Sequence, residues 1–173
     1  DYLRRMQAAA GRMRSLINDL LTFSRLTSHA KNFVKVDLNA ILNDVISDFE
    51  PRLQETKGTI TVGELTQLDA DALQIHQLFQ NLLSNSLKYY RPDVPPVVEI
   101  SGEYVSYAPG IEPAYRITVK DNGIGFDDKY RERIFDLFER LHSRSDYDGT
   151  GIGLAICRKI AEQHNGRISA AGI

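Results

Sequence analysis

The stretch FQNLLSNSLKYY, residues 79–90, has the apolar spacing of a core helix but carries an unusual set of polar side chains. Three leucines give the predicted helix an apolar side, while Asn81, Asn85 and Lys88 recur one turn apart beside it. At 3.6 residues per turn, these three residues fall within an arc of about 60°. The stretch therefore predicts a helix with a polar stripe along the border of its buried face.

The chemistry of this stripe suits a metal ion and a phosphate. A carboxamide oxygen is a hard, neutral ligand for Mg²⁺, which keeps several waters and takes phosphate oxygens as further partners. A lysine one turn further on can reach a terminal phosphate. Taken alone, the stripe is more simply explained as the solvated edge of a core helix, with both asparagines there by chance.

The composition is that of an ordinary soluble globular protein, since 42% of the 173 residues are hydrophobic and 25% are charged. The net charge of −2 gives no electrostatic case for binding nucleic acid or a membrane. Cys157 is the only cysteine, so no intrachain disulfide is possible and a cytoplasmic location is expected. The opening DYLRR lies inside a helical pattern and lacks a start methionine, which favours a piece of a longer protein, soluble or membrane-anchored.

Residues 1–28 predict a long amphipathic helix, because apolar residues step by three and four as in a heptad seam. The seam comprises Leu3, Met6, Ala10, Met13, Ile17 and Leu20. One such helix cannot bury its stripe alone. A coiled-coil linker and one helix of a dimeric bundle both fit this pattern, and the pattern does not separate them.

The rest of the chain predicts helices and strands in alternation, after an extended linker at TSHAKNFVKVDL. One helix is expected over residues 39–56, capped by Asn39 or Asp37, and another from Asp69 or Asp71 through the opening stretch. Strands are expected within residues 58–65, 97–107 and 114–121, and a last one begins at RISAAGI, residues 167–173. This order predicts an α/β (α+β) two-layer sandwich, with helices on one face of a mixed sheet, preceded by the long amphipathic helix.

Two glycine motifs add candidate ligand contacts. In DNGIGF, residues 121–126, Asp121 ends a predicted strand, where ligand sites of layered α/β folds open, although a tight turn also explains the motif. In DGTGIGLAI, residues 148–156, three glycines alternate before a helix that begins near Leu154. Backbone N–H groups and a helix N-terminus suit a phosphate there. The spacing matches neither the P-loop nor the dinucleotide motif, so another phosphate loop is favoured over a structural turn.

Taken together and in this order, the motifs resemble those of the catalytic, ATP-binding domain of bacterial sensor histidine kinases. That domain belongs to a superfamily shared with DNA gyrase, heat-shock chaperones and mismatch-repair ATPases. The matching motifs are the N box QNLLSNSLKYY, the first glycine box DNGIGF, the F box RIFDLFERL and the second glycine box GTGIGLAI. The resemblance covers about residues 36–171 and implies an ATP- and Mg²⁺-binding domain over residues 37–173, with a mobile lid at 127–148.

The resemblance also implies residue roles in nucleotide binding. Asn85 would coordinate Mg²⁺, with Asn81 and Lys88 facing the phosphates and Tyr89 lying against the nucleotide. Asp121 would accept a hydrogen bond from the adenine amino group. Further nucleotide contacts would come from the two glycine boxes, through Gly123, Gly125, Gly149, Thr150, Gly151, Ile152, Gly153 and Leu154.

In the lid, the resemblance implies that Phe135 and Phe138 anchor the F box. Arg140 would neutralise charge on the transferring phosphoryl group. Asn81, Lys88 and Arg140 are therefore the expected catalytic residues.

Residues 1–28 resemble the second helix of the family's dimerisation and phosphoacceptor hairpin, with residues 29–36 as the linker to the ATP domain. The resemblance implies a homodimer through this hairpin in the full-length protein, and a response regulator as the onward phosphoryl acceptor. The phosphoacceptor histidine belongs on the first helix of the hairpin, and none of the four histidines of this chain has that context. We therefore expect the chain to bind ATP without phosphorylating itself.

The residue at position 81 distinguishes phosphoryl transfer to histidine from ATP hydrolysis within the superfamily. The hydrolytic relatives carry a glutamate general base four residues before the metal-binding asparagine, and here that position is Asn81. A carboxamide cannot accept a proton at neutral pH, so the pattern favours phosphoryl transfer to histidine over hydrolysis. The alternatives are an ATP-hydrolysing relative, and a nucleotide-binding or dimerisation module without kinase activity.

Overall fold

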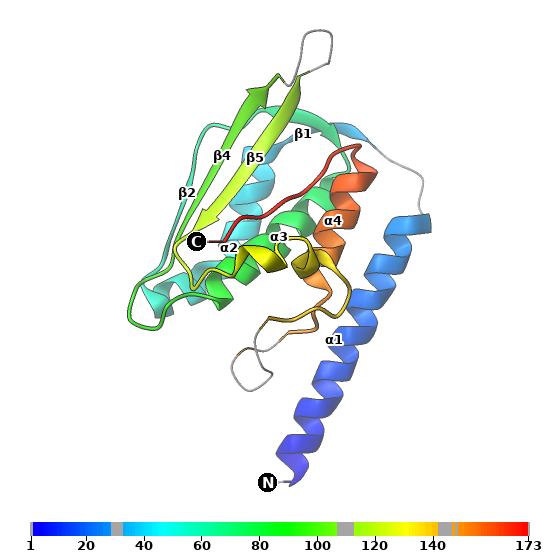
Figure 1. Ribbon diagram of the computed structural model, residues 1–173, viewed down its shortest axis with the longest axis vertical. Helices are drawn as coiled ribbons and strands as arrows, with labels where there is room; N and C mark the ends of the chain where they lie inside the picture. The colour runs from blue at the N-terminus through cyan, green and yellow to red at the C-terminus, as the bar shows by residue number, and fades with distance from the viewer. Residues whose placement is uncertain (1, 29–32, 107–112, 142–146, 148, 173) are drawn as a thin grey trace. The chain divides into compact units, whose positions relative to one another are not determined.

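The computed structural model describes residues 2–28, 33–106, 113–141, 147 and 149–172. The chain divides into two compact units, one formed by residues 32–125 and the other by residues 1–31 together with 126–173. Figure 1 shows the elements in chain order.

The unit of residues 32–125 contains two sheets. In the larger sheet, β2 (Thr59–Val62) pairs parallel with β4 (Val97–Val105), and β4 pairs antiparallel with β5 (Ala114–Asp121). In the smaller sheet, β1 (Val34–Asp37) pairs antiparallel with β3 (Gln67–Ala70). The mixed sheet predicted from the sequence is therefore confirmed.

Two helices cover one face of the larger sheet, as Figure 1 shows. Helix α2 (Leu38–Thr56) is capped by Asp37, whose carboxylate accepts hydrogen bonds from the backbone N–H groups of residues 39 and 40. Helix α3 (Ala72–Lys88) is capped in the same way by Asp71. Of the two cap residues that the sequence left open at each helix, the structure selects the aspartates at 37 and 71, because their carboxylates satisfy the first free N–H groups.

The core of this unit lies between the two helices and the larger sheet. Its fully or nearly fully buried members include Leu42 and Val45 of α2, Phe79 of α3, and Val98 and Ile100 of β4. The apolar positions of each helix are spaced so that they share one face, and burial of that face is the main stabilising term. The predicted two-layer sandwich is confirmed in this arrangement.

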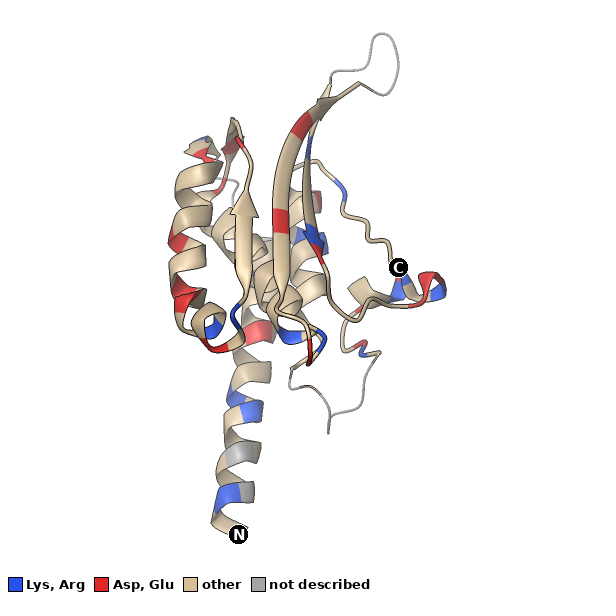
Figure 2. Cartoon of the chain, turned by 90° about the vertical axis from the view of Figure 1, so that its left-hand side faces the viewer, with Lys and Arg blue, Asp and Glu red and all other residues tan. Residues whose placement is uncertain are grey.

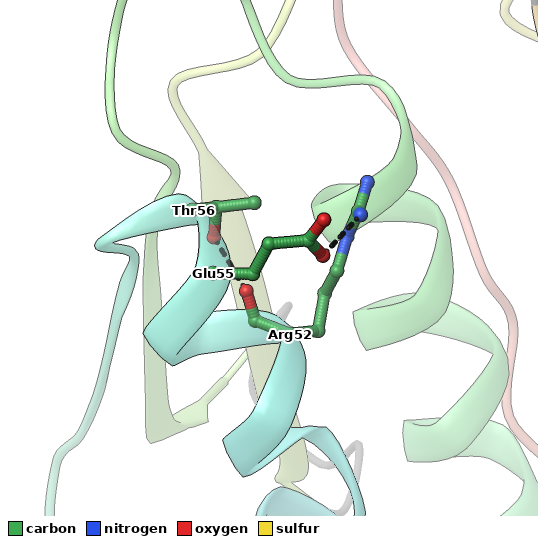
Figure 3. A network of polar contacts seen from close by, with 3 residues as sticks. All are labelled: Arg52, Glu55 and Thr56. Carbon is green, nitrogen blue, oxygen red and sulfur yellow. Dashed lines mark hydrogen bonds and ion pairs between the residues drawn. The ribbon is translucent and has the colours of Figure 1, made fainter.

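Polar contacts link residues in the last turns of α2 (Figure 3). The Arg52 guanidinium donates a 2.8 Å hydrogen bond to Glu55, and the Thr56 hydroxyl donates to the Arg52 carbonyl oxygen. The same guanidinium lies 5.7 Å from the ring centroid of Tyr90, within the range of a cation–π contact. Helix α2 then ends at Lys57, which adopts a left-handed conformation.

Two predictions about strands were wrong. The stretch predicted as an extended linker ends in β1, which pairs with β3, a strand that the sequence analysis did not predict. Each strand has only four residues, which is too short for a clear alternating pattern. The sequence also predicted a strand from RISAAGI. The described residues 167–172 of this stretch join neither sheet and form no hydrogen-bonded ladder.

The second unit contains α1 (Tyr2–Ser28), two short 3₁₀ helices, η1 (Asp128–Tyr130) and η2 (Arg133–Phe135), and α4 (Gly153–Gln163). Helix α4 packs against α1 and against η2. The predicted seam of α1 is exposed, with 76% of Leu3 and 58% of Ile17 accessible. Among the described residues, no helix combines the length and the apolar character that crossing a membrane requires.

We expect Asp71→Ala to lower the free energy of unfolding by about 1 kcal/mol, because it removes the acceptor for two N–H groups at the start of α3. Urea unfolding followed by circular dichroism measures this change. The matched control is Asp69→Ala, which removes an exposed carboxylate that caps no helix. Equal losses in the two variants would contradict the capping role.

Candidate functional site

The polar stripe on α3 lies at the border of its buried face, as predicted. Asn81, Asn85 and Lys88 are partly exposed, whereas Leu83 and Leu87 of the same helix are buried in the core. Tyr89 is the C-cap residue, and its N–H donates to the carbonyl oxygen of Asn85. The Lys88 ammonium lies 4.2 Å from the centroid of the Tyr89 ring, so a cation–π contact holds both side chains at the helix end.

The first glycine box is fixed to α3 through Asp121, the last residue of β5. One carboxylate oxygen accepts a 3.1 Å hydrogen bond from the Ser86 hydroxyl, and the other accepts a 2.9 Å bond from the N–H of Gly123. An ionised carboxylate offers about four acceptor positions, so Asp121 can still accept a bond from a ligand. These two bonds orient the Asp121 carboxylate and leave it acceptor positions for a ligand.

The sequence analysis missed Ser86. Only 6% of this residue is exposed, and within the described residues it is the one buried polar side chain. The available signal was its place on the helix, three residues after the buried Leu83, where the pattern calls for an apolar residue. A hydroxyl at such a position requires a buried partner, and Asp121 supplies it.

The backbone of the first glycine box touches the end of α3 directly. The N–H of Ile124 donates a 2.9 Å hydrogen bond to the carbonyl oxygen of Tyr89. A Cβ atom on Gly123 would lie 2.5 Å from that same oxygen, so only glycine permits the approach. The Arg91 side chain adds a 3.0 Å bond to the carbonyl oxygen of Gly123. Within the unit of residues 32–125, the structure therefore brings the N box and the first glycine box together.

Asn122 is a second residue that the sequence analysis did not single out. Its side-chain oxygen accepts from the N–H of Val97, and its side-chain nitrogen donates to the carbonyl oxygen of Pro95. The side chain thus ties the end of β5 to the start of β4. The sequence signal was weak, because an Asn-Gly pair after a strand is common in turns.

The second glycine box belongs to the other unit and is held by the end of the F box. The N–H of Phe138 donates a 2.9 Å hydrogen bond to the carbonyl oxygen of Gly151. Gly151 has a φ of +74°, and a Cβ atom there would lie 2.9 Å from the backbone of Phe138. The loop then enters α4 through Ile152, which is fully buried, so the loop is anchored at its end.

Arg140 is part of this anchoring. Its guanidinium donates hydrogen bonds to the carbonyl oxygens of Gly149, at 2.7 Å, and Tyr147, at 2.5 Å. Two bonds from one planar group fix the orientation of the segment before the glycine box. The contact of Arg140 with phosphate stays a prediction.

The predicted lid at 127–148 is described for residues 127–141 and 147; the rest of it lies outside the described residues. Phe135 is 3% exposed and anchors η2, with the Arg158 guanidinium 5.2 Å from its ring centroid. Phe138 is 57% exposed, so its predicted role as an anchor through the ring was wrong. Its backbone N–H instead donates to the carbonyl oxygen of Gly151 and so holds the second glycine box.

The segment predicted as a lid begins with an exposed ion pair. The Asp127 carboxylate lies 2.7 Å from the Lys129 ammonium and caps η1. The hydrogen bonds from Lys129 hold the pKa of Asp127 below its usual value, and the same pair raises the pKa of Lys129. Solvent screens a pair this exposed, so the pair adds little to the stability of the fold.

The donor atoms fit a magnesium–nucleotide ligand in kind. Asn81 and Asn85 present neutral amide oxygens one turn apart, which suit Mg²⁺ that is also bound to phosphate oxygens. The glycine box precedes the N-terminus of an 11-residue helix, and the positive end of the helix dipole there favours an anion.

Comparisons with known proteins agree with this chemistry. The family model described as "Histidine kinase-, DNA gyrase B-, and HSP90-like ATPase" matches residues 70–172. The phytochrome-like protein Cph1 of Synechocystis is 36% identical over 168 residues, which are 97% of this chain and 22% of Cph1. The sensor protein kinase WalK of Staphylococcus saprophyticus is 33% identical over 94% of this chain and 26% of its own.

A similar fold occurs in a solved structure. The crystal structure of full-length ShkA in complex with AMPPNP has a TM-score of 0.76 and 26% identity, over 99% of this chain and 35% of that one. The present chain spans about a quarter of the length of the curated relatives named above.

We expect Gly123→Ala to lower the free energy of unfolding by about 1–3 kcal/mol, because the added methyl group meets the Tyr89 carbonyl oxygen and the backbone must shift. Chemical denaturation measures the loss. Gly63→Ala is the matched control, since its Cβ atom would have its nearest neighbour at 3.5 Å, an ordinary contact. A Gly123 variant as stable as the Gly63 variant would contradict the close approach.

Proposed function

Because the chain belongs to the histidine kinase-, DNA gyrase B- and HSP90-like ATPase family, we propose that it is the ATP-binding part of a sensor histidine kinase. It binds Mg-ATP and transfers the γ-phosphoryl group to a histidine that lies on a helix outside this chain. A response regulator then receives the phosphoryl group. The observation that carries the proposal is the direct joining of the N box to the first glycine box, through Tyr89, Gly123 and Asp121.

The N box binds the metal and phosphates. Asn85 is the proposed ligand of Mg²⁺, which supplies charge neutralisation for the phosphate oxygens when bound. Asn81 and Lys88 face the phosphates, and the cation–π contact with Tyr89 limits where the ammonium can point. Tyr89 in turn lies against the nucleotide.

The first glycine box binds the base. Asp121 accepts a hydrogen bond from the adenine amino group, and its bonds from Ser86 and Gly123 hold the carboxylate in place for it. Gly123 and Gly125 line the base pocket. A neutral amide in place of this carboxylate would present its N–H₂ group to some of these donors and weaken the selection of adenine.

The second glycine box and the lid bind the phosphates. The proposed contacts come from Gly149, Thr150, Gly151, Ile152, Gly153 and Leu154, through loop N–H groups and the start of α4. Arg140 neutralises charge on the transferring phosphoryl group once it leaves the carbonyl oxygens of Tyr147 and Gly149. The lid spans residues 127–148.

The residue at position 81 favours a kinase over an ATPase. An asparagine there cannot take a proton from water, whereas an imidazole acceptor is a better nucleophile and needs less help. We further propose that residues 1–28 are the second helix of a dimerisation hairpin, residues 29–36 a linker and residues 37–173 the catalytic domain. The exposed seam of α1 supports a homodimer. We propose a cytoplasmic location, without nucleic-acid or membrane contact by this chain.

The proposal is tested by adding Mg-ATP and a separate helical hairpin that bears the phosphoacceptor histidine. We expect phosphoryl transfer to the hairpin, lowered about tenfold or more in Asn85→Ala, because loss of the metal ligand weakens transition-state stabilisation. Gln80→Ala, at an exposed position of the same helix, is the control for helix damage. Brisk Mg²⁺-dependent hydrolysis that disappears in Asn85→Ala, without transfer to the hairpin, would overturn the kinase assignment.

The role of position 81 has its own test. We expect Asn81→Glu to raise ATP hydrolysis about tenfold or more, because a positioned general base contributes roughly 10²–10⁴-fold when its geometry is right. Asn81→Gln, whose side chain has the length of glutamate without a basic carboxylate, should show no such rise in hydrolysis. A steady-state phosphate-release assay measures both, and equal rates in the two variants would contradict the argument.

A further inference from the structure

A carboxylate of α1 is bonded to the second glycine box. The Thr150 hydroxyl donates a 2.6 Å hydrogen bond to an oxygen of Asp19, across 131 positions of sequence but within one compact unit. Both groups are partly buried, which strengthens a bond to an ionised acceptor relative to one in open water. The glycine box is therefore attached to α1 by a side chain that the sequence analysis did not single out.

Asp19 is the only acidic residue within Tyr2–Ser28, a helix with five arginines. Figure 2 shows basic residues at intervals along this helix. The same unit packs α1 against α4, so the contact belongs to a helix interface. The single carboxylate of the helix is thus placed against a loop and a helix N-terminus that favour an anion.

The bond to Asp19 and a bond to phosphate exclude each other. A threonine hydroxyl has one hydrogen to donate, and here that hydrogen is directed at the carboxylate. A phosphate oxygen brought to the same hydroxyl would also face the negative charge of Asp19 at close range, which is unfavourable. A nucleotide phosphate and Asp19 therefore compete for Thr150.

The rest of the loop is held independently of this bond. Gly151 is fixed by the N–H of Phe138, and the segment before it by the guanidinium of Arg140. Loss of the Asp19 carboxylate therefore leaves the loop with its other contacts. Nucleotide affinity can change without collapse of the site.

We propose that Asp19 is a positioning residue that couples α1 to the nucleotide site by holding Thr150 away from phosphate. Binding of nucleotide releases the Asp19 contact, and formation of the contact weakens nucleotide binding by the same factor, since linkage is reciprocal. This inference rests on the proposed function, because it takes Thr150 as a phosphate contact. It adds a route by which a movement of α1 changes nucleotide affinity.

The experiment is calorimetric titration of the whole chain with Mg-ADP. We expect Asp19→Ala to lower the Kd about fivefold, the lower end of typical couplings between sites. In Asp19→Asn, an amide oxygen can still accept the hydroxyl hydrogen, so the gain should be smaller. Asn18→Ala, at the exposed neighbouring position of α1, is the matched control and should leave the Kd unchanged.

A double-mutant cycle separates the hydrogen bond from a general charge effect. In a Thr150→Val background, Asp19→Ala should change the Kd by less than about twofold, because no hydroxyl is left to release. An equal gain in both backgrounds, or no gain in the unaltered background, would overturn the inference. If Thr150→Val abolishes binding, amide hydrogen exchange of α1 tests the coupling instead. Mg-ADP should speed exchange near Asp19 in the unaltered chain but not in Asp19→Ala. Identical responses in the two chains would refute the coupling.

The two proposals fail in different ways. A chain with no affinity for Mg-ADP would defeat the proposed function itself. A chain that binds Mg-ADP with the same Kd whether or not Asp19 is present would defeat only the coupling.

Discussion

The contact between the carbonyl oxygen of Tyr89 and the backbone of the first glycine box is the constraint on which the larger unit depends. The N–H of Ile124 bonds to that oxygen, and Gly123 lies so close to it that a side chain would not fit. This contact sets the distance between the end of α3 and the end of β5. The polar stripe of α3 and the carboxylate of Asp121 consequently belong to one surface rather than to two separate elements.

The same constraint explains why polar groups are tolerated beside the core. Phe79 and Leu83 are fully buried, and the asparagines at 81 and 85 lie at the border of that buried face, partly exposed. Ser86, which is buried, is satisfied by Asp121. The Ser86 hydroxyl thus avoids the free-energy cost of an unmade hydrogen bond, and its partner is a residue of the proposed site.

In the other unit, hydrogen bonds from the F box fix the second glycine box and the segment before it. The Phe138 N–H and the Arg140 guanidinium hold the carbonyl oxygens of the glycine box and the segment before it. These contacts engage carbonyl oxygens of this segment and not its N–H groups. The Asp19 contact differs from them, because it engages a side-chain hydroxyl and not a carbonyl oxygen of the backbone. It is the contact that our proposal makes sensitive to nucleotide.

The sequence by itself determined the main helices, the strands of the larger sheet, the polar stripe and the order of the four boxes. These features depend on residues close together in the chain, where spacing and capping chemistry suffice. Only the tertiary structure decided that Gly123 is required by Tyr89, that Ser86 supports Asp121, that β1 pairs with β3, and that Asp19 bonds to Thr150. Each of these joins residues that are distant in sequence, and their meeting is set by packing, which no local pattern encodes.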